Sequence, residues 1–124
     1  MAAELNYIDL ATKYFFYAMH MDLANIGGNV EHGLHLASMG GIWMAVVYGA
    51  GGMRDYDGDL SFDPKITKNT RRLAFHLTLR NDNLLEVDIQ PKATTYTLKE
   101  GKQLSFHHRK KKVTLKLGQS RSMA

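Results

Sequence analysis

The spacing of apolar residues changes once along this sequence, and that change constrains the fold more than any other feature. Over residues 4–48, apolar side chains recur every three or four positions, as on the buried face of a helix. From Arg71 onward they alternate with polar residues, as in strands that have one buried face. The sequence therefore predicts an α+β fold in which two antiparallel helices precede a small antiparallel β-sheet or sandwich domain.

The first predicted helix covers residues 4–24, which contain neither Pro nor Gly. Segment 25–29 then breaks the helical pattern, and it offers a glycine for the left-handed position after the last turn. Asn29 is placed to cap the helix that follows, because asparagine is favoured at that position. We therefore expect two helices joined by a short turn.

The second predicted helix covers residues 30–48 and carries three glycines, Gly33, Gly40 and Gly41. Each glycine costs about 1 kcal/mol relative to alanine inside a helix. Nearly all of the other side chains are apolar or small, so this helix is expected to be buried on every side. One neighbouring helix cannot cover it, and the sequence thus indicates a part of something larger, or self-association through the helices.

Five strands and one shorter strand are expected after the helices. The glycines of segment 49–52 end the helical part. The alternating segments lie at 73–79, 85–89, 94–98, 104–106 and 113–117, with the shorter strand at 60–62. Turns between them predict an antiparallel meander. We accordingly expect two helices over residues 1–52, a β-domain over 53–118 and a disordered tail over 119–124.

Length and composition exclude several classes of protein. The chain has 124 residues, enough for one domain, and no apolar run of the roughly 18–20 residues that a membrane span needs. It has no cysteine, which excludes disulfide frameworks, thiolate zinc sites and cysteine nucleophiles. Glu4 and Asp9 stand where a secretory signal would be basic, so a cytoplasmic location without membrane contact is expected.

Opposite charges divide the chain. Residues 1–63 carry eight acids and two bases, for a net charge of −6, whereas residues 64–124 carry fourteen bases and four acids, for a net charge of +10. The halves are expected to attract one another, or to offer a basic face to an anionic partner. The most basic run, 107–112, falls at a predicted hairpin turn and lacks interleaved aromatic residues, so nucleic acid is not the expected partner.

Four polar residues gather in the helix predicted over 30–48, namely Glu31, His32, His35 and Ser38. Spacings of three and four residues bring the other three toward His35 on the surface of a helix. Three interpretations remain open. The cluster is a polar helix start whose histidines are hydrogen-bonded, an anion site at the helix N-terminus, or a metal site that needs a further ligand.

Other familiar motifs are not found. Asp55, Asp57 and Asp59 suggest a calcium loop, but counted from Asp55 the sequence has neither the glycine at position six nor the glutamate at position twelve. The sequence contains no P-loop, nucleophile elbow or dinucleotide-binding fingerprint. We therefore predict no catalytic residue, no metal and no resident cofactor in this chain.

A family resemblance is carried by segment 31–43, with the sequence EHGLHLASMGGIW. It resembles the E-G-I-H-L-A-S-M-A-G signature in the last helices of glycoside hydrolase family 65. That family includes maltose, trehalose and kojibiose phosphorylases and some related hydrolases. Segment 49–64, GAGGMRDYDGDLSFDP, resembles the family's G-x-x-G-L-R…L-x-F-x-P passage into its C-terminal domain. Residues 73–117 resemble the small sheet of that domain, so the resemblance covers nearly the whole chain.

The resemblance implies a place within a larger enzyme. Members of the family have an N-terminal β-sandwich, an (α/α)6 barrel and a C-terminal sheet domain, and they cleave α-glucosides with inversion. The helices here would be the last of the barrel. The phosphorylases use inorganic phosphate as co-substrate, and His35 matches the family's phosphate-binding histidine. The stretch Glu31-His32-Gly33 departs from the family pattern, so Glu31, His32 and Ser38 are treated only as possible neighbours of that site.

The resemblance also implies that this chain lacks the essential proton donor. The family's general-acid glutamate lies upstream of the residues present here, and inverting cleavage requires such a donor. We expect the chain by itself to be inactive, or to complement the remainder of the enzyme in trans. The alternative is a standalone binding module or subunit whose basic face holds a sugar phosphate or a nucleic acid. His35 favours a phosphorylase over a hydrolase as the parent enzyme.

Overall fold

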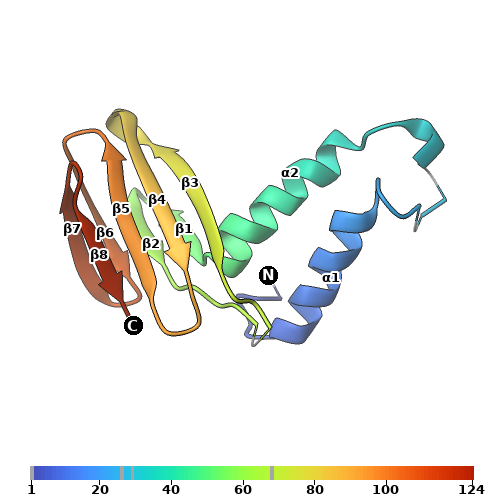
Figure 1. Ribbon diagram of the computed structural model, residues 1–124, viewed down its shortest axis with the longest axis horizontal. Coiled ribbons are helices and arrows are strands. Elements are labelled where there is room, and N and C mark those ends of the chain that lie inside the picture. The colour runs from blue at the N-terminus through green and yellow to red at the C-terminus, as the bar shows by residue number, and fades with distance from the viewer. Residues whose placement is uncertain (1, 26, 29, 68) are drawn as a thin grey trace.

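The structure is a computed structural model that describes residues 2–25, 27–28, 30–67 and 69–124. Two helices that run in opposite directions extend from a β-domain built from two sheets (Figure 1). This arrangement confirms the α+β fold expected from the change of hydrophobic period. The cap predicted at Asn29 lies outside the described residues.

The first helix, α1 (Ile8–His20), is shorter at both ends than the helix predicted over residues 4–24. Asn6 has a φ of +65°, which a right-handed helix does not contain, so the residues before α1 form a turn. After His20 the chain turns away from the helix through the segment that holds Asp22. The short turn therefore begins earlier than the sequence pattern indicated.

The segment predicted as one helix over residues 30–48 is divided. A 3₁₀ turn, η1 (Val30–His32), is followed by non-helical backbone before α2 (Leu36–Met44), which continues into a π-helical turn, η2 (Ala45–Ala50). Gly33 has a φ of +85° in the left-handed region, and this conformation interrupts the helix. As a result, His35 occupies the N-cap position of α2 instead of an interior position.

Within this chain the apolar second helix is left largely uncovered, as expected for a helix that has only one neighbouring helix. No residue of α1 or α2, all of which the structure describes, is buried, and Trp43 is 49% exposed. The reason is that α1 is the helix packed along α2, and one neighbour leaves most of an apolar helix uncovered. Other large apolar side chains exposed on the two helices are Leu10, Tyr14, Phe16, Tyr17, Met19, Leu36, Met39 and Met44.

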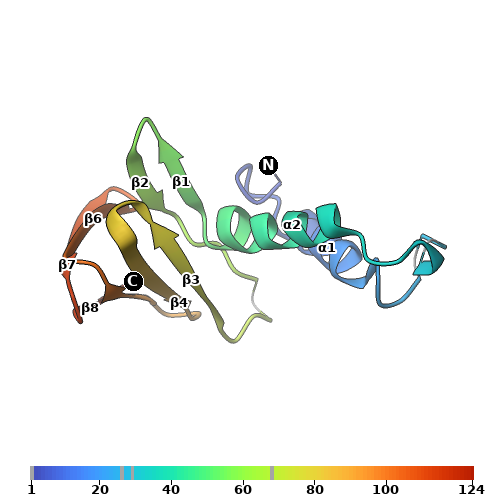
Figure 2. The ribbon, with the colours of Figure 1, turned by 90° about the horizontal axis from the view of Figure 1, so that it is seen from above.

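The β-domain is built from two four-stranded sheets (Figure 2). The first has the strand order β1 (Met53–Tyr56), β2 (Asp59–Phe62), β6 (Gln103–His108) and β7 (Lys111–Lys116). The second has the order β3 (Leu73–Leu79), β4 (Asn83–Ile89), β5 (Thr94–Glu100) and β8 (Ser120–Met123). Paired strands run antiparallel except β2 and β6, which are parallel.

Two expectations for the strands are corrected. The chain crosses between the sheets three times, from β2 to β3, from β5 to β6 and from β7 to β8, so the domain is not a simple meander. The tail at 119–124 is not disordered, because β8 pairs along β5 and the hydroxyls of Thr97 and Ser120 hydrogen-bond at 2.8 Å. Neither β8 nor β1 has the apolar alternation that identifies the other strands, so the sequence pattern did not reveal them.

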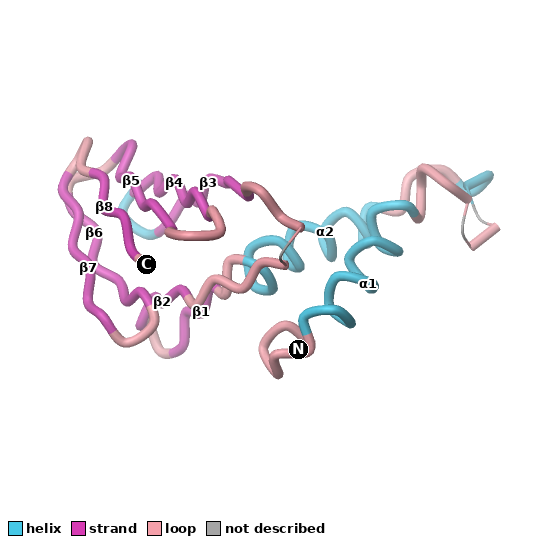
Figure 3. Tube along the Cα trace, turned by 60° about the horizontal axis from the view of Figure 1, so that its bottom comes forward, coloured by secondary structure: helices cyan, strands magenta, loops and turns pink. Residues whose placement is uncertain are grey.

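The core of the β-domain lies between its two sheets, which face one another in Figure 3. Its three largest fully buried side chains are Tyr96, Phe62 and Phe106, whose ring centroids lie 4.8 to 5.5 Å apart. Every second residue of β4 is buried, as the alternating pattern predicted. An aromatic cluster from both sheets therefore holds the domain together.

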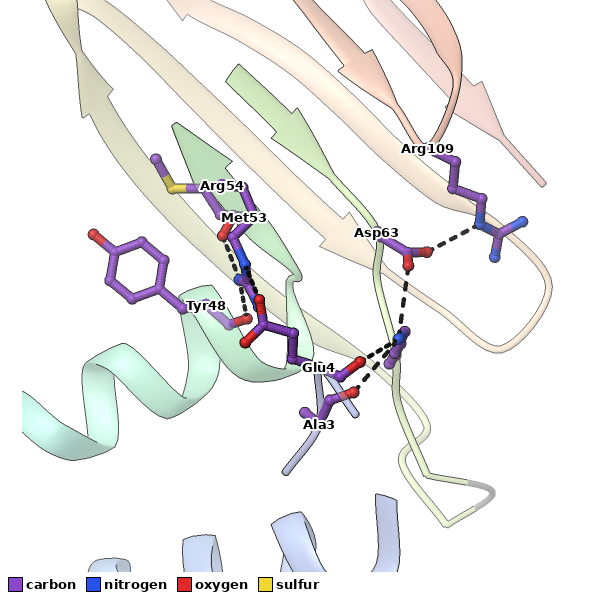
Figure 4. Close-up of polar contacts among 8 residues, drawn as sticks. Ala3, Glu4, Tyr48, Met53, Arg54, Asp63 and Arg109 are labelled. Atoms are coloured by element: carbon purple, nitrogen blue, oxygen red, sulfur yellow. Dashed lines mark hydrogen bonds and ion pairs between the residues drawn. The ribbon is translucent and has the colours of Figure 1, made fainter. Parts of the chain in front are cut away.

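Arg54 on β1 joins the end of the helices to the β-domain (Figure 4). Its Nη1 donates to the main-chain carbonyls of Tyr48 at 2.7 Å and Met53 at 2.6 Å, and its Nε donates to the Glu4 carboxylate at 3.1 Å. The hydrogen bond from Arg54 holds the pKa of the Glu4 carboxyl below its ordinary value. The N-terminal turn is thus attached to the first strand.

The acidic and basic halves of the chain meet at Asp63. Its carboxylate lies 3.3 Å from the Arg109 Nε and 3.8 Å from the Lys65 Nζ (Figure 4). Lys65 also donates to the main-chain carbonyls of Ala3 and Glu4, at 3.4 and 3.5 Å. The attraction expected between the two halves therefore includes these local contacts at the junction.

A tyrosine–histidine hydrogen bond lies inside the β-domain. The Tyr96 hydroxyl is 2.7 Å from the His108 Nδ1, and these residues are 0% and 3% exposed, respectively. Burial lowers the pKa of His108 and raises the pKa of Tyr96. At neutral pH both groups are therefore uncharged, and the hydroxyl and the Nδ1 of a neutral ring share this hydrogen bond.

We expect the β-domain to lose stability as the pH falls below about 6.5, the pKa of an unfolded histidine. The unfolded chain then binds a proton at His108 that the buried ring, with its lowered pKa, does not bind. One such group contributes at most about 1.4 kcal/mol per pH unit to the slope. Urea unfolding followed by circular dichroism, from about pH 7.5 to about pH 5, measures this slope.

The variant His108→Asn is the control for this prediction. Asparagine can still accept a hydrogen bond from Tyr96 but does not titrate. Its free energy of unfolding should therefore fall less steeply with decreasing pH than that of the original chain. Equal slopes in the two proteins would show that His108 does not cause the loss of stability.

Candidate functional site

His35 is placed at the first turn of α2, beside the end of α1. Its main-chain carbonyl accepts from the amides of Ser38 at 2.9 Å and Met39 at 3.2 Å, which begins the helix. The side chain is 27% exposed. The N-terminus of a helix carries partial positive charge and amides that lack helical partners, and both favour the binding of an anion. His35 is therefore placed beside a position that favours an anion.

Asp22 contacts His35 twice from the turn after α1. The Asp22 Oδ2 accepts from the His35 main-chain N–H at 3.0 Å, and the Oδ1 is hydrogen-bonded to the ring Nδ1. The side chain of Asp22 is 13% exposed. The hydrogen bond from the His35 ring holds the pKa of the Asp22 carboxyl below its ordinary value. The site is therefore an aspartate–histidine pair that joins the two helices.

Asp22 is the site residue that the sequence interpretation missed. It lies thirteen residues before His35, outside any helical spacing that would link the two. The signal that could have found it is topological. An antiparallel helix pair places the end of the first helix opposite the start of the second, and Asp22 follows that end directly.

The other three predicted neighbours of His35 are placed differently from one another. Ser38 turns toward α1, where its Oγ lies 2.9 Å from the Sδ of Met21. Glu31 and His32 belong to η1 and are exposed. The prediction that Glu31 and His35 share one helical face is wrong, because the backbone between η1 and α2 is not helical.

Two features that the described residues lack limit the kind of site present. Among residues 2–25, 27–28, 30–67 and 69–124, no three histidine, cysteine, aspartate or glutamate side chains gather as a metal site would require. Within the same described residues, none of the helices has the length and apolar character needed to cross a membrane.

An open groove of about 910 Å³ separates the helices from the β-domain. Its lining is mostly apolar and includes Phe15 on α1, Met44 on α2 and Ile66 in the connection between the sheets. His35 is not among the described residues that line it. The aspartate–histidine pair and the groove are therefore separate features.

The helices and the β-domain both match segments of glycosyl hydrolases. Residues 1–44 match the family description "Glycosyl hydrolase family 65 central catalytic domain", and residues 53–115 match "Glycosyl hydrolase family 65, C-terminal domain". The chain belongs to glycoside hydrolase family 65. The resemblance in the sequence signature and its flanks is thereby confirmed.

Similar proteins include several disaccharide phosphorylases. The chain is 36% identical over 119 residues to the α,α-trehalose phosphorylase of Thermoanaerobacter brockii, covering 96% of this chain and 15% of that protein. It is 34% identical over 107 residues to the maltose phosphorylase of Bacillus subtilis, covering 86% of this chain and 14% of that protein. The chain therefore spans about 15% of the length of curated relatives that it matches.

A solved structure shares the arrangement of helices and sheets. It is described as "Putative kojibiose phosphorylase from human microbiome", with 27% sequence identity and a TM-score of 0.87. The similarity covers 99% of this chain and 18% of that one. The α+β arrangement seen here is thus also found within a much longer protein.

Proposed function

We propose that this chain forms the last barrel helices and the C-terminal domain of an inverting α-glucoside phosphorylase. Membership of family 65 and the similarity to trehalose and maltose phosphorylases support this proposal. The uncovered apolar surface of α2 supports a position among further helices. The substrate would be an α-glucosyl disaccharide such as trehalose or maltose, and inorganic phosphate would be the co-substrate.

The observation that carries the proposal is the placement of His35. Inverting phosphorolysis needs a phosphate oxygen to attack the anomeric carbon while the glycosidic bond breaks and an acid protonates the leaving oxygen. His35 would hold the phosphate at the positive end of α2, with Asp22 fixing the ring. The proton donor would come from a part of the enzyme outside this chain. The product would be β-glucose 1-phosphate.

We expect the purified chain to show no phosphorolysis of trehalose, maltose or kojibiose. A phosphate-binding histidine without an acid and a sugar site does not form a preorganised active site. The measurement is release of glucose 1-phosphate in the presence of inorganic phosphate. Turnover by the chain itself would contradict this prediction. Binding of a sugar phosphate or nucleic acid without any role in phosphorolysis would instead favour a standalone binding module.

A hybrid enzyme tests the positive part of the proposal. In the Thermoanaerobacter brockii trehalose phosphorylase, the segment that matches this chain would be replaced by this chain. The hybrid should phosphorolyse trehalose, and His35→Ala should lower kcat/KM for phosphate by about 10²–10³, the loss expected for a preorganised charge-stabilising contact. His107→Ala is the matched control, because it also removes a histidine side chain but from β6, in the β-domain. An active hybrid whose phosphate kinetics do not change with His35→Ala would refute the assigned role.

A further inference from the structure

Asp22 holds His35 through two separate hydrogen bonds. One bond, at 3.0 Å to the main-chain N–H, fixes the start of α2 against the turn after α1. The other, to Nδ1, fixes the imidazole ring itself. Both side chains are mostly shielded, at 13% and 27% exposure, so water competes weakly for these bonds.

The ionisation of Asp22 determines which ring nitrogen carries a proton. The bonds from His35 keep the pKa of the Asp22 carboxyl below its ordinary value, so the group is a carboxylate at neutral pH. A carboxylate can only accept hydrogen bonds, and Nδ1 must therefore be protonated. Any contact between the ring and a phosphate oxygen then has to be made through Nε2. As an imidazolium the ring donates there, and as a neutral ring it accepts from a phosphate O–H.

We infer that Asp22 is a positioning residue for phosphate binding by His35, acting by fixing the tautomer and orientation of its ring. The inference rests on the proposed function, because that function supplies phosphate as the ligand. Carboxylates that hold the second nitrogen of a functional histidine have this effect in other sites. Asp22 itself need not touch the phosphate, and as an anion it would repel one at close range.

The tautomer can be measured in the 124-residue chain without any substrate. In the structure each carboxylate oxygen of Asp22 accepts one of the two bonds, and Asp22→Asn replaces one of these oxygens with an NH2 donor, so one of the two bonds loses its acceptor. Long-range ¹H–¹⁵N correlations of the neutral His35 ring should show the proton on Nδ1 in the original chain and a shift toward Nε2 in the variant. Asp57→Asn, in the turn between β1 and β2, is the matched control and should leave the His35 signals unchanged. An unchanged tautomer in Asp22→Asn overturns the inference.

Kinetics of the hybrid enzyme separate this inference from the proposed function. Asp22→Asn should raise the KM for phosphate about 10–100-fold, with a smaller change in the KM for trehalose. Asp22→Glu keeps the charge and should restore part of the loss. Added to His35→Ala, Asp22→Asn should have little further effect, because it acts through the ring.

The kinetic results distinguish a failure of the proposed role of His35 from a failure of the positioning role of Asp22. If His35→Ala leaves both kcat/KM and KM for phosphate unchanged, the proposed role of His35 fails and the inference fails with it. If His35→Ala raises that KM while Asp22→Asn does not, the role of His35 stands and the positioning role of Asp22 is overturned. Fully additive effects of the two substitutions also overturn it. Circular dichroism of each variant identifies any loss of fold.

Discussion

Replacing Phe62 with alanine is expected to lower the free energy of unfolding of the β-domain by about 3–5 kcal/mol. Phe62 is 0% exposed on β2, and its ring contacts Tyr96 and Phe106 with centroids 5.3 and 5.5 Å away. The substitution removes apolar burial, leaves a cavity between the sheets and breaks both ring contacts. A small domain has about 5–15 kcal/mol of stability in total, so this single change would remove a large part of that stability.

The measurement is urea unfolding followed by circular dichroism. With a slope of about 1–3 kcal/mol per molar urea, the midpoint should fall by about 1 M or more, or the variant should be unfolded without urea. Phe16→Ala is the matched control, because the same atoms are removed from a ring on α1 that is 52% exposed. It should change stability by about 0.5 kcal/mol or less. Similar losses in the two variants would show that the aromatic cluster does not hold the β-domain together.

The strands were predictable where one face of the sheet is buried. In β4 the apolar residues Leu85, Val87 and Ile89 are at most 2% exposed, and the residues between them are more exposed. This alternation can be identified from sequence because the side-chain period of a strand is two. It does not identify which strand pairs with which, so the crossings between sheets and the parallel pair of β2 and β6 were not foreseen.

The errors in the helical part have a local cause and a tertiary cause. Locally, the positive φ of Gly33 ends the helical pattern before His35, although apolar residues continue at helical spacing through it. At the tertiary level, Asp22 reaches His35 only because the end of α1 lies against the start of α2. Helical spacing in the sequence does not encode this contact. The motif in residues 31–43 identified the family but did not reveal this partner.

Replacing Gly52 with alanine is the second change with a large expected effect. Gly52 lies between η2 and β1 with a φ of +62°, and a Cβ there would stand 2.0 Å from the main-chain oxygen of Asp63. The left-handed conformation alone costs alanine about 1–2 kcal/mol. The collision adds to this cost because main-chain atoms cannot rotate away as a side chain would. The two segments would have to separate, which would also strain the hydrogen bond of 3.1 Å from the Asp63 amide to the Gly52 carbonyl.

Gly58→Ala separates the collision from the conformational cost. Gly58 also has a left-handed φ, +85°, but a Cβ there would be no closer than 3.9 Å to its nearest neighbour, the Arg80 side chain. Gly58→Ala should therefore cost about 1–2 kcal/mol, and Gly52→Ala should exceed about 3 kcal/mol in the same urea measurement. If the losses of unfolding free energy in the two variants differ by less than about 0.5 kcal/mol, the connection between η2 and β1 can move to accept a Cβ at little cost. A large difference would instead identify this backbone contact as the constraint that sets where the first strand leaves the helices.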